Sequence, residues 1–556
     1  MKYVLFLTIV LLTQNLIYSI TIPDSVVSFT SSILPIVVIN TNGQVIPGDH
    51  KITVDMGIIY NGDGVRNYIT DPFNNYDGKI AIELRGSTSL SYPKKQYGFE
   101  TRDSSGNNNN VSLLGFPPEN DWILNAPYVD KTLIRNAIVY KLANETGRYA
   151  SRSKFCELVL NGEYMGVYIL FEKIKRDNNR VNIKKLEPPD TTGDALTGGY
   201  IIKVDKVDGE NVGGWYSNYY PFPQSDKRIF YQYHYPKPDE IVTQQKQYIQ
   251  DYIYNFETRM KGSNIADSTN GYPRYIDIDS FADYLLINEI CRNIDAYRLS
   301  MFMHKDRESL NGKLVMGPVW DYNLSFGNVN YYLGYQVHGW DIEHISDYNN
   351  IPLWENFYTP FWWKKLFDDT TFRNTIYSRW QLLKNSTFST SNIHGIIDSL
   401  VSLLDEAQVR NFEKWPILGV HIDPNYFVGQ TYQDEINYLK NWVTARIQWM
   451  HQNMVGISGN IGGTPGFIPE EFVLYQNYPN PFNASTTIKF SIPNSEFVTL
   501  KIFDMLGREI SVLVNKYMEA GRYDVIFESS DLISSVYFYK IEAGSYVQTK
   551  KMIIIK

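Results

Sequence analysis

The stretch Phe281-Ala-Asp-Tyr-Leu-Leu-Ile-Asn-Glu-Ile-Cys-Arg-Asn-Ile-Asp295 decides how the middle of the chain is interpreted. Residues 281–291 are apolar nearly all round, which predicts a buried central helix. Asp295 follows the helix, and an aspartate in such apolar surroundings is costly unless it is paired or bound to a metal. Two short strands are expected around 301–304 and 313–316. The motif Gly317-Pro-Val-Trp-Asp321-Tyr-Asn323-Leu-Ser-Phe326-Gly327 comes directly after them.

The sequence before this stretch is rich in predicted strands. Runs with period-two character cover residues 34–39, 79–85, 95–101, 155–160 and 166–172. Asn161-Gly162 joins the last two runs and is a strong hairpin signal. A helix is expected over 131–144, with Asp130 as its cap and Gly147 as its stop.

The sequence after it predicts one closing helix, a linker and a second domain. The helix is expected over 431–450, where Thr431 and Asp434 resemble a capping box. Residues 455–470 are rich in Gly and Pro, which is typical of a linker. Residues 471–556 show short alternating runs separated by turn signals, which predict a small all-β sandwich.

Composition and the N-terminal residues exclude several classes of protein. Residues 1–20 resemble a signal peptide, since Lys2 precedes a short apolar run, and no later stretch is apolar enough to predict a transmembrane segment. The formal net charge of −8 argues against a nucleic-acid partner. With only Cys156 and Cys291, the chain has neither a disulfide framework nor a Cys-rich zinc site. We expect a soluble protein outside the cytoplasm.

The order of elements predicts an α+β fold: an atypical bilobal protein-kinase-like domain followed by a small all-β sandwich domain. The kinase-like domain is expected over 21–454, with a strand-rich N-lobe over about 21–200 and a helical C-lobe over about 201–454. In kinases one Asp orients or deprotonates the acceptor hydroxyl, and a second Asp holds Mg²⁺ on the phosphates. Asp295 and Asp321, one hairpin apart, stand in that relation.

One metal ligand of protein kinases lacks an obvious equivalent. An Asn five residues after the catalytic Asp binds the second metal there, and Ser300, a weaker ligand, occupies that position here. Asn323 or Asn293 could take its place, since Mg²⁺ accepts amide carbonyl oxygen as well as carboxylate.

A series of longer motifs points to a family. They are Arg85-Gly-Ser-Thr-Ser89, Pro93-Lys-Lys95, Glu119-Asn-Asp-Trp122, Arg135-Asn136, Asn161-Gly-Glu-Tyr-Met-Gly-Val-Tyr168, Glu172-Lys-Ile-Lys175, Gly198-Gly-Tyr200, Trp320-Asp-Tyr-Asn323 and Ala407-Gln-Val-Arg-Asn-Phe412. Through most of residues 33–452 the chain resembles the secreted branch of the CotH (spore coat protein H) kinase family. The resemblance implies a kinase-like fold, ATP with Mg²⁺ or Mn²⁺, and phosphorylation of protein hydroxyls.

The resemblance assigns roles to individual residues. Asp295 matches the catalytic Asp and Asp321 the metal-binding Asp, while Asn323 stands where some members have a second Asp. Lys94 and Lys95 match a basic strand start. Strand alternation predicts that Lys95 points inward and is the better phosphate ligand.

Two further residues complete the predicted cofactor site. Arg85, on a Gly-Ser-rich turn, is a second candidate phosphate ligand, and the backbone of Glu172 is expected where a kinase hinge would read adenine. The kinase pattern is met only in part, because the sequence has no GxGxxG loop and the helix over 131–144 has no mid-helix Glu.

The C-terminal residues resemble a second family. The runs Tyr475-Gln-Asn-Tyr-Pro-Asn-Pro-Phe-Asn483, Ser485-Thr-Thr-Ile488 and Phe503-Asp-Met-Leu-Gly-Arg-Glu509 resemble the type A C-terminal sorting domain of type IX secretion. One departure is Ser535, where that family usually has Gly. The resemblance implies export by the type IX secretion machinery to the medium or the cell surface.

Other interpretations stay open at this point. Asp295 and Asp321 also fit structural caps, and Lys94 and Lys95 fit a solvated edge. For the whole chain, the first hypothesis is an exported kinase that transfers the ATP γ-phosphate to Ser or Thr hydroxyls of an unknown protein. The alternatives are a catalytically inactive surface scaffold and a glycan-binding protein, the latter suggested by export and by 43 Tyr residues.

Overall fold

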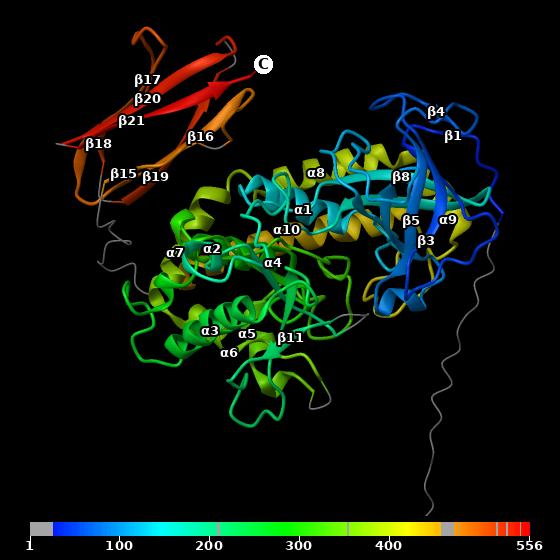
Figure 1. Cartoon of the computed structure of the whole chain (residues 1–556), viewed down its shortest axis with the longest axis horizontal. Helices are drawn as coiled ribbons and strands as arrows, with labels where there is room; N and C mark the ends of the chain where they lie inside the picture. The colour runs from blue at the N-terminus through cyan, green and yellow to red at the C-terminus, as the bar shows by residue number, and fades with distance from the viewer. Residues whose placement is uncertain are drawn as a thin grey trace, which may run out of the picture.

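The computed structural model describes residues 26–207, 212–352, 355–457, 472–477, 479–518, 521–529, 532–544 and 546–555. It shows a mixed domain of helices and sheets and an all-β C-terminal unit (Figure 1). The predicted signal peptide and most of the predicted linker lie outside the described residues. Among the helices of the described part, none combines the length and apolarity that crossing a membrane needs.

Seven strands near the N-terminus close into a barrel in the order β2-β3-β5-β6-β7-β9-β8. The parallel pair of β2 and β8 closes it, and the other pairs are antiparallel. Asn161 and Gly162 both have positive φ in the turn between β8 and β9, as a two-residue hairpin of this type requires. The predicted strands are confirmed, whereas β3 and β7 were not predicted. The strands are β2 (Ile36–Asn40), β3 (Ile52–Ile59), β5 (Tyr76–Arg85), β6 (Gln96–Arg102), β7 (Asp121–Asn125), β8 (Ser153–Leu160) and β9 (Glu163–Glu172).

Helix α1 (Arg135–Glu145) begins four residues later than predicted. The prediction of Asp130 as its cap is wrong, because the N-cap is Ile134 and residues 130–134 form a turn that precedes the helix. The Asp130 carboxylate nevertheless accepts the backbone N–H of Arg135, the first helical residue, at 2.9 Å. Gly147, with φ of 87°, follows the helix end as expected.

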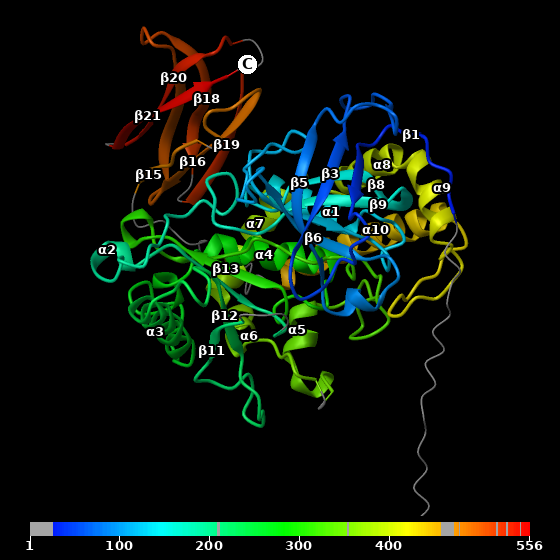
Figure 2. The ribbon, with the colours of Figure 1, turned by 45° about the vertical axis from the view of Figure 1, so that its right-hand side comes forward.

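A second, five-stranded antiparallel sheet lies in the middle of the chain (Figure 2). Its order is β11-β12-β10-β13-β14, so the predicted hairpin of β13 and β14 is confirmed. Helix α4 (Ile278–Cys291) is buried from Ser280 onward and packs against α1, α7, α10 and β14, which confirms it as the central helix. The strands are β10 (Tyr200–Val204), β11 (Gly214–Tyr216), β12 (Phe230–Tyr235), β13 (Met301–Lys305) and β14 (Leu314–Met316).

The last helices of this domain return to the barrel. Helix α9 (Asp405–Lys414) packs on β9, and its Arg410 pairs with Glu157 of β8 at 2.6 Å. One apolar core contains residues of α1, β9, α4 and α10, so the strand-rich and helical parts share it. The two-lobed kinase-like layout therefore stays a prediction, and residues 201–454 hold a sheet as well as helices.

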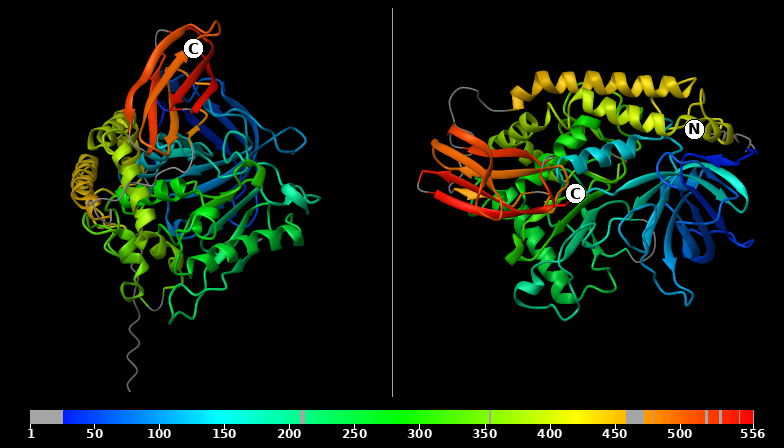
Figure 3. Two further views of the ribbon diagram at one scale, coloured as in Figure 1. Left: turned by 90° about the vertical axis from the view of Figure 1, so that its left-hand side faces the viewer. Right: turned by 90° about the horizontal axis from the view of Figure 1, so that it is seen from above.

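The long helix α10 (Tyr432–Ile457) runs along one side of the domain (Figure 3). Its capping box is confirmed: the Thr431 N–H donates to Asp434 at 2.9 Å, and the Asp434 N–H donates to the Thr431 hydroxyl at 3.1 Å. The helix continues past its predicted end into the first residues of the predicted linker. The other elements of this domain are β1 (Ser31–Ser32), β4 (Asn67–Tyr68), α2 (Gly193–Leu196), α3 (Thr243–Met260), α5 (Asp341–Ser346), α6 (Phe361–Asp368), α7 (Thr370–Leu383), α8 (Thr390–Leu403) and short 3-10 turns at 88–91, 272–274, 308–310 and 348–350.

The C-terminal unit consists of two antiparallel sheets, β15-β16-β19 and β18-β17-β20-β21. Alternate residues of both sheets, such as Ile488 and Leu500, form one core, which confirms the predicted small all-β domain. Its strands are β15 (Val473–Leu474), β16 (Ser485–Ile492), β17 (Glu496–Phe503), β18 (Glu509–Met518), β19 (Gly521–Glu528), β20 (Ser535–Ala543) and β21 (Tyr546–Ile554).

Candidate active site

The loop that carries Asp321 is held in place by helix α1. The Asn136 side chain accepts the Tyr322 N–H at 2.6 Å, and the Arg135 guanidinium donates to the Ser325 carbonyl at 3.0 Å. The Asp321 N–H donates to the hydroxyl of the buried Tyr140 at 3.3 Å. These bonds hold Asp321 in a left-handed conformation, with φ of 67°, which is uncommon for a residue other than glycine.

Asn293 joins this loop to the segment that carries Asp295. Its amide donates to the Asp321 carbonyl at 3.5 Å, and its side-chain oxygen accepts the Asp295 N–H at 3.4 Å. Arg292, in a left-handed conformation with φ of 45°, ends α4 and turns the chain toward this contact. The structure therefore brings the two predicted acidic motifs together.

The Asp321 carboxylate stands among other charges. In the described part of the chain its oxygens form no hydrogen bond or ion pair, and the side chain is exposed. Crowding by surrounding protein atoms, followed by the charges of Asp295 and Asp205, raises its pKa to about 6. The carboxylate thus combines close protein surroundings with access to water.

Asp205, at the end of β10, is a site residue that the sequence analysis missed. Its carboxylate accepts the Ser300 N–H at 3.3 Å and pairs with Lys203 at 3.0 Å. The available signal was an aspartate directly after the apolar strand Tyr200–Val204, the same kind of signal that singled out Asp295. Asp205 followed no recognised motif, and its approach to Asp321 depends on the sheet.

The charges of two cations act on Asp321. Arg85, at the end of β5, has its guanidinium 5.6 Å from the centre of the Trp320 ring. Burial lowers the pKa of Arg85, and the negative charge of Asp321 opposes that shift. Lys206, which was not predicted, donates to the Thr88 hydroxyl at 3.2 Å, and its charge also acts on Asp321. The Gly-Ser-rich turn after β5 and the end of β10 thus meet near the acidic group.

The two predicted lysines lie elsewhere, and the prediction that Lys95 points inward is wrong. Lys94 is the buried residue, with 1% exposure, and donates to the Val167 carbonyl at 2.6 Å and the Asn411 side chain at 2.7 Å. Lys95 is half-buried and donates to the Leu90 carbonyl at 2.6 Å. Strand β6 begins only at Gln96, so its alternation does not extend back to these residues.

Glu172 is also occupied by contacts within the protein. Its fully buried carboxylate pairs with Arg152 at 2.7 Å, and its N–H donates to the Arg152 carbonyl at 3.3 Å. Residue 172 is further paired with Trp122 in the barrel. The Glu172 N–H therefore already has an acceptor within the protein. The role of the Glu172 backbone in binding adenine stays a prediction.

Comparison with family models places the chain. The model described as CotH kinase protein matches residues 82–450, more than half of the chain. The chain belongs to the CotH kinase family. A second model, described as secretion system C-terminal sorting domain, matches residues 476–556, and it marks this CotH-family chain as a secreted or cell-surface protein.

Other comparisons with known proteins add little to the CotH match. No curated protein matches the chain. Among solved structures, the twitchin kinase region from C. elegans (Fn31-NL-kin-CRD-Ig26) is 10% identical over 95% of this chain and 99% of its own, with a TM-score of 0.13. That likeness carries no argument about the fold.

The acidic residues of the CotH domain fit a metal that substrate phosphates help to hold. Within the described residues, no three His, Cys, Asp or Glu side chains stand close enough to form a metal site. Mg²⁺ needs no such cage, because it is usually held by one or two carboxylates together with substrate phosphates and water. The uncommitted carboxylate of Asp321 fits this mode. Asn323 has a half-buried side chain nearby, whereas the amide of Asn293 already bridges two backbone groups.

The structure shows the state of the two cysteines. Cys156 in β8 and Cys291 in α4 are both buried and free. Burial raises the pKa of both thiols, so neither has the character of a nucleophile.

Proposed function

We propose that this CotH-family chain is an exported kinase that transfers the γ-phosphoryl group of ATP to Ser or Thr hydroxyls of a protein. The observation that carries the proposal is the Asp321 carboxylate, whose oxygens have no partner among the described residues and which the Asn293 bridge joins to the segment of Asp295. The charges of Arg85, Asp295 and Asp205 all act on this carboxylate. A cation with a polyphosphate would suit this group, because the metal would offset the clustered carboxylates and the guanidinium would meet phosphate oxygen.

The residues divide the work of the transfer. The acceptor hydroxyl oxygen attacks the γ-phosphorus, the bond from that phosphorus to the β–γ bridging oxygen breaks, and ADP leaves. The hydroxyl proton passes to the Asp295 carboxylate. Asp295 is paired with Arg298 at 3.0 Å, and this pair fixes the carboxylate so that it can orient the acceptor hydroxyl.

The remaining charges position the phosphates. Arg85 and Lys206 would contact phosphate oxygens from the turn after β5 and from the end of β10. Asp321 would hold Mg²⁺ or Mn²⁺, and Asn323 is the nearest amide in sequence that could assist. When bound, the metal would neutralise charge that develops on the phosphates.

The first test is thermal unfolding of the full chain with ATP and Mg²⁺ or Mn²⁺. Ligand at 100 times its dissociation constant should add about 2.7 kcal/mol of stability. The shift should need the metal, disappear in Asp321→Ala and persist in Asp77→Ala, an exposed aspartate on β5. Transfer of label from γ-labelled ATP to protein then tests the chemistry. A well-folded sample with no shift in either metal would contradict the proposal.

A catalytically inactive scaffold is the second candidate. It is favoured by Ser300 at the position of a metal-binding Asn and by Asn323, where some family members have a second Asp. It predicts a folded protein with no metal-dependent response to ATP. A glycan-binding protein predicts, in addition, a thermal shift with polysaccharide.

A further inference from the structure

A cavity of about 430 Å³ lies beside the candidate active site and has no role in the proposed chemistry so far. Two of its lining residues connect it to that site. Asp205 faces the cavity and is also one of the carboxylates that act on Asp321. Arg298 lines it as well and pairs with Asp295. A group held in the cavity would therefore be close to the residues proposed to receive the acceptor hydroxyl.

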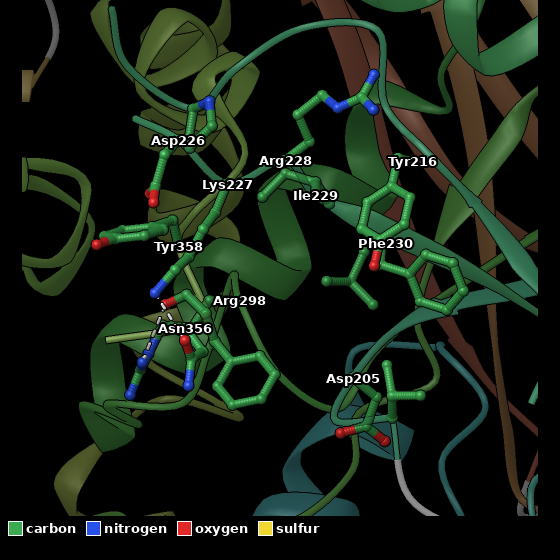
Figure 4. A pocket seen from close by; sticks show the side chains of 14 residues that line it. Asp205, Tyr216, Asp226, Lys227, Arg228, Ile229, Phe230, Arg298, Asn356 and Tyr358 are labelled. Atoms are coloured by element: carbon green, nitrogen blue, oxygen red, sulfur yellow. Dashed lines mark hydrogen bonds between the residues drawn. The ribbon is translucent and has the colours of Figure 1, made fainter. Parts of the chain in front are cut away.

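The cavity has an apolar side and a polar side (Figure 4). Tyr216, Ile229 and Phe230 form the apolar side, and the Tyr216 and Phe230 rings are in contact with centroids 4.8 Å apart. Lys227, Asn356 and Tyr358 form much of the opposite side. The apolar side offers a surface on which a carbon-rich side chain can be removed from water.

Three cations line the cavity, and each has contacts within the protein. The Arg228 guanidinium donates to the Ser217 carbonyl at 3.4 Å and lies 5.6 Å from the centre of the Tyr216 ring. Lys227 donates to the Glu355 carbonyl at 2.9 Å and to the Asn356 side chain at 2.6 Å. Arg298 pairs with Glu355 at 2.9 Å in addition to Asp295. Asp205 and Asp226 also line the cavity and add negative charge, so the cavity is a poor site for an anion.

The cavity also stands at the end of an edge strand. Among the described residues, β11 is the first strand of the five-stranded sheet and pairs only with β12. Tyr216, its last residue, is 56% exposed and lines the cavity. Extended peptides commonly bind along a free strand edge and place single side chains in neighbouring pockets.

We propose that this cavity is the acceptor subsite and that it takes a bulky apolar side chain, aromatic or branched, flanking the hydroxyl-bearing residue of an extended peptide. This inference rests on the proposed kinase function, because the cavity is called an acceptor subsite only if the neighbouring residues transfer phosphate. The peptide selectivity of the cavity can nevertheless be measured without catalysis.

The test measures both binding and transfer with the full chain. Blocked glycine-rich hexapeptides would carry one Ser flanked, before or after, by Phe, Leu, Ala or Asp. Binding is measured by titration calorimetry, and transfer with labelled ATP and Mg²⁺. We expect the Phe and Leu peptides to bind at least about tenfold more tightly than the Ala and Asp peptides, because they bury a large apolar side chain.

Variants locate the effect. Phe357 lines the cavity as well. Phe230→Ala and, independently, Phe357→Ala should remove the preference and raise KM for the Phe peptide, with little change in kcat or in the ATP-dependent thermal shift. Tyr68→Ala, an exposed aromatic on β4, should keep the preference.

The results separate the kinase function from the peptide subsite. A preference for Phe and Leu without phosphoryl transfer would overturn the kinase function and keep the peptide site. Transfer without any preference, or a preference unaffected by both variants, would overturn the subsite. Binding of chitotetraose that Phe230→Ala abolishes, with no peptide binding, would assign the cavity to a glycan instead.

Discussion

Arg85 and Lys94 stand close together in the sequence, yet the structure gives them opposite surroundings. Arg85 ends β5, and the negative charges of Asp321 and Asp205 act on its guanidinium. Lys94 is buried between β9 and α9, and its ammonium donates to a carbonyl and an amide, with no carboxylate among its partners. Burial lowers the pKa of Lys94 to about 7. The comparison shows that a basic residue in a family motif can hold two elements together, as Lys94 does, instead of binding the ligand.

The substitution Arg85→Ala should have the largest effect, a loss of phosphoryl-transfer activity. Loss of a preorganised donor to the transferred phosphoryl group should reduce kcat/KM by about 10²-fold. Lys at this position should restore only part of it, because Lys lacks the planar two-pronged geometry. Labelled-phosphate transfer measures the effect, with Arg274→Ala, an exposed arginine, as the control. Equal activity of Arg85→Ala and the control would place Arg85 outside the site.

Lys94→Ala should act on stability instead. It removes the donor to the buried Val167 carbonyl and one of the two donors to the Asn411 side-chain oxygen, which still accepts the Val167 N–H. This loss costs about 1–3 kcal/mol of unfolding free energy. The variant should keep its ATP-dependent thermal shift at temperatures where it is folded. Denaturant unfolding measures the loss. A normal stability with a lost ATP response would show that Lys94 is a ligand after all.

The same contrast predicts a pH dependence. The pKa of a lysine in an unfolded chain is about 10.4. In the folded protein, burial lowers the pKa of Lys94 to about 7. Between these values the unfolded state binds more protons, so the contribution of Lys94 to the unfolding free energy rises with pH, by at most about 1.4 kcal/mol per unit. Denaturant unfolding from pH 6 to 9, with Lys94→Met beside the wild type, should show their stability difference shifting in favour of the wild type. A constant difference would contradict the lowered pKa.

The smallest expected effect is that of Lys95→Ala. Its ammonium makes one exposed hydrogen bond to the Leu90 carbonyl, so the change should cost less than about 0.5 kcal/mol and leave phosphate transfer unaltered. Thermal unfolding and the transfer assay check both. A strong loss of activity would contradict this expectation and would support Lys95 as a phosphate ligand.

Local signals explain what could be predicted. The turn at Asn161-Gly162, the capping box at Thr431 and the apolar helix before Asp295 each depend on residues within a few positions. They place the two acidic motifs on the correct elements, and the family motifs then indicate their roles. Strand β7 escaped prediction because Asp121–Asn125 is short and buried within the barrel.

The sequence by itself determined the central helix, the closing helix, the hairpins, the family and the two acidic motifs, because capping, turn chemistry and apolar periodicity act over short distances along the chain. Only the tertiary structure decided which polar residues share the site. Closure of the barrel by β2 and β8 and packing of α9 on β9 bury Lys94, while the five-stranded sheet carries Asp205 and Lys206 toward Asp321. These contacts join residues far apart in the sequence, and no local pattern specifies them.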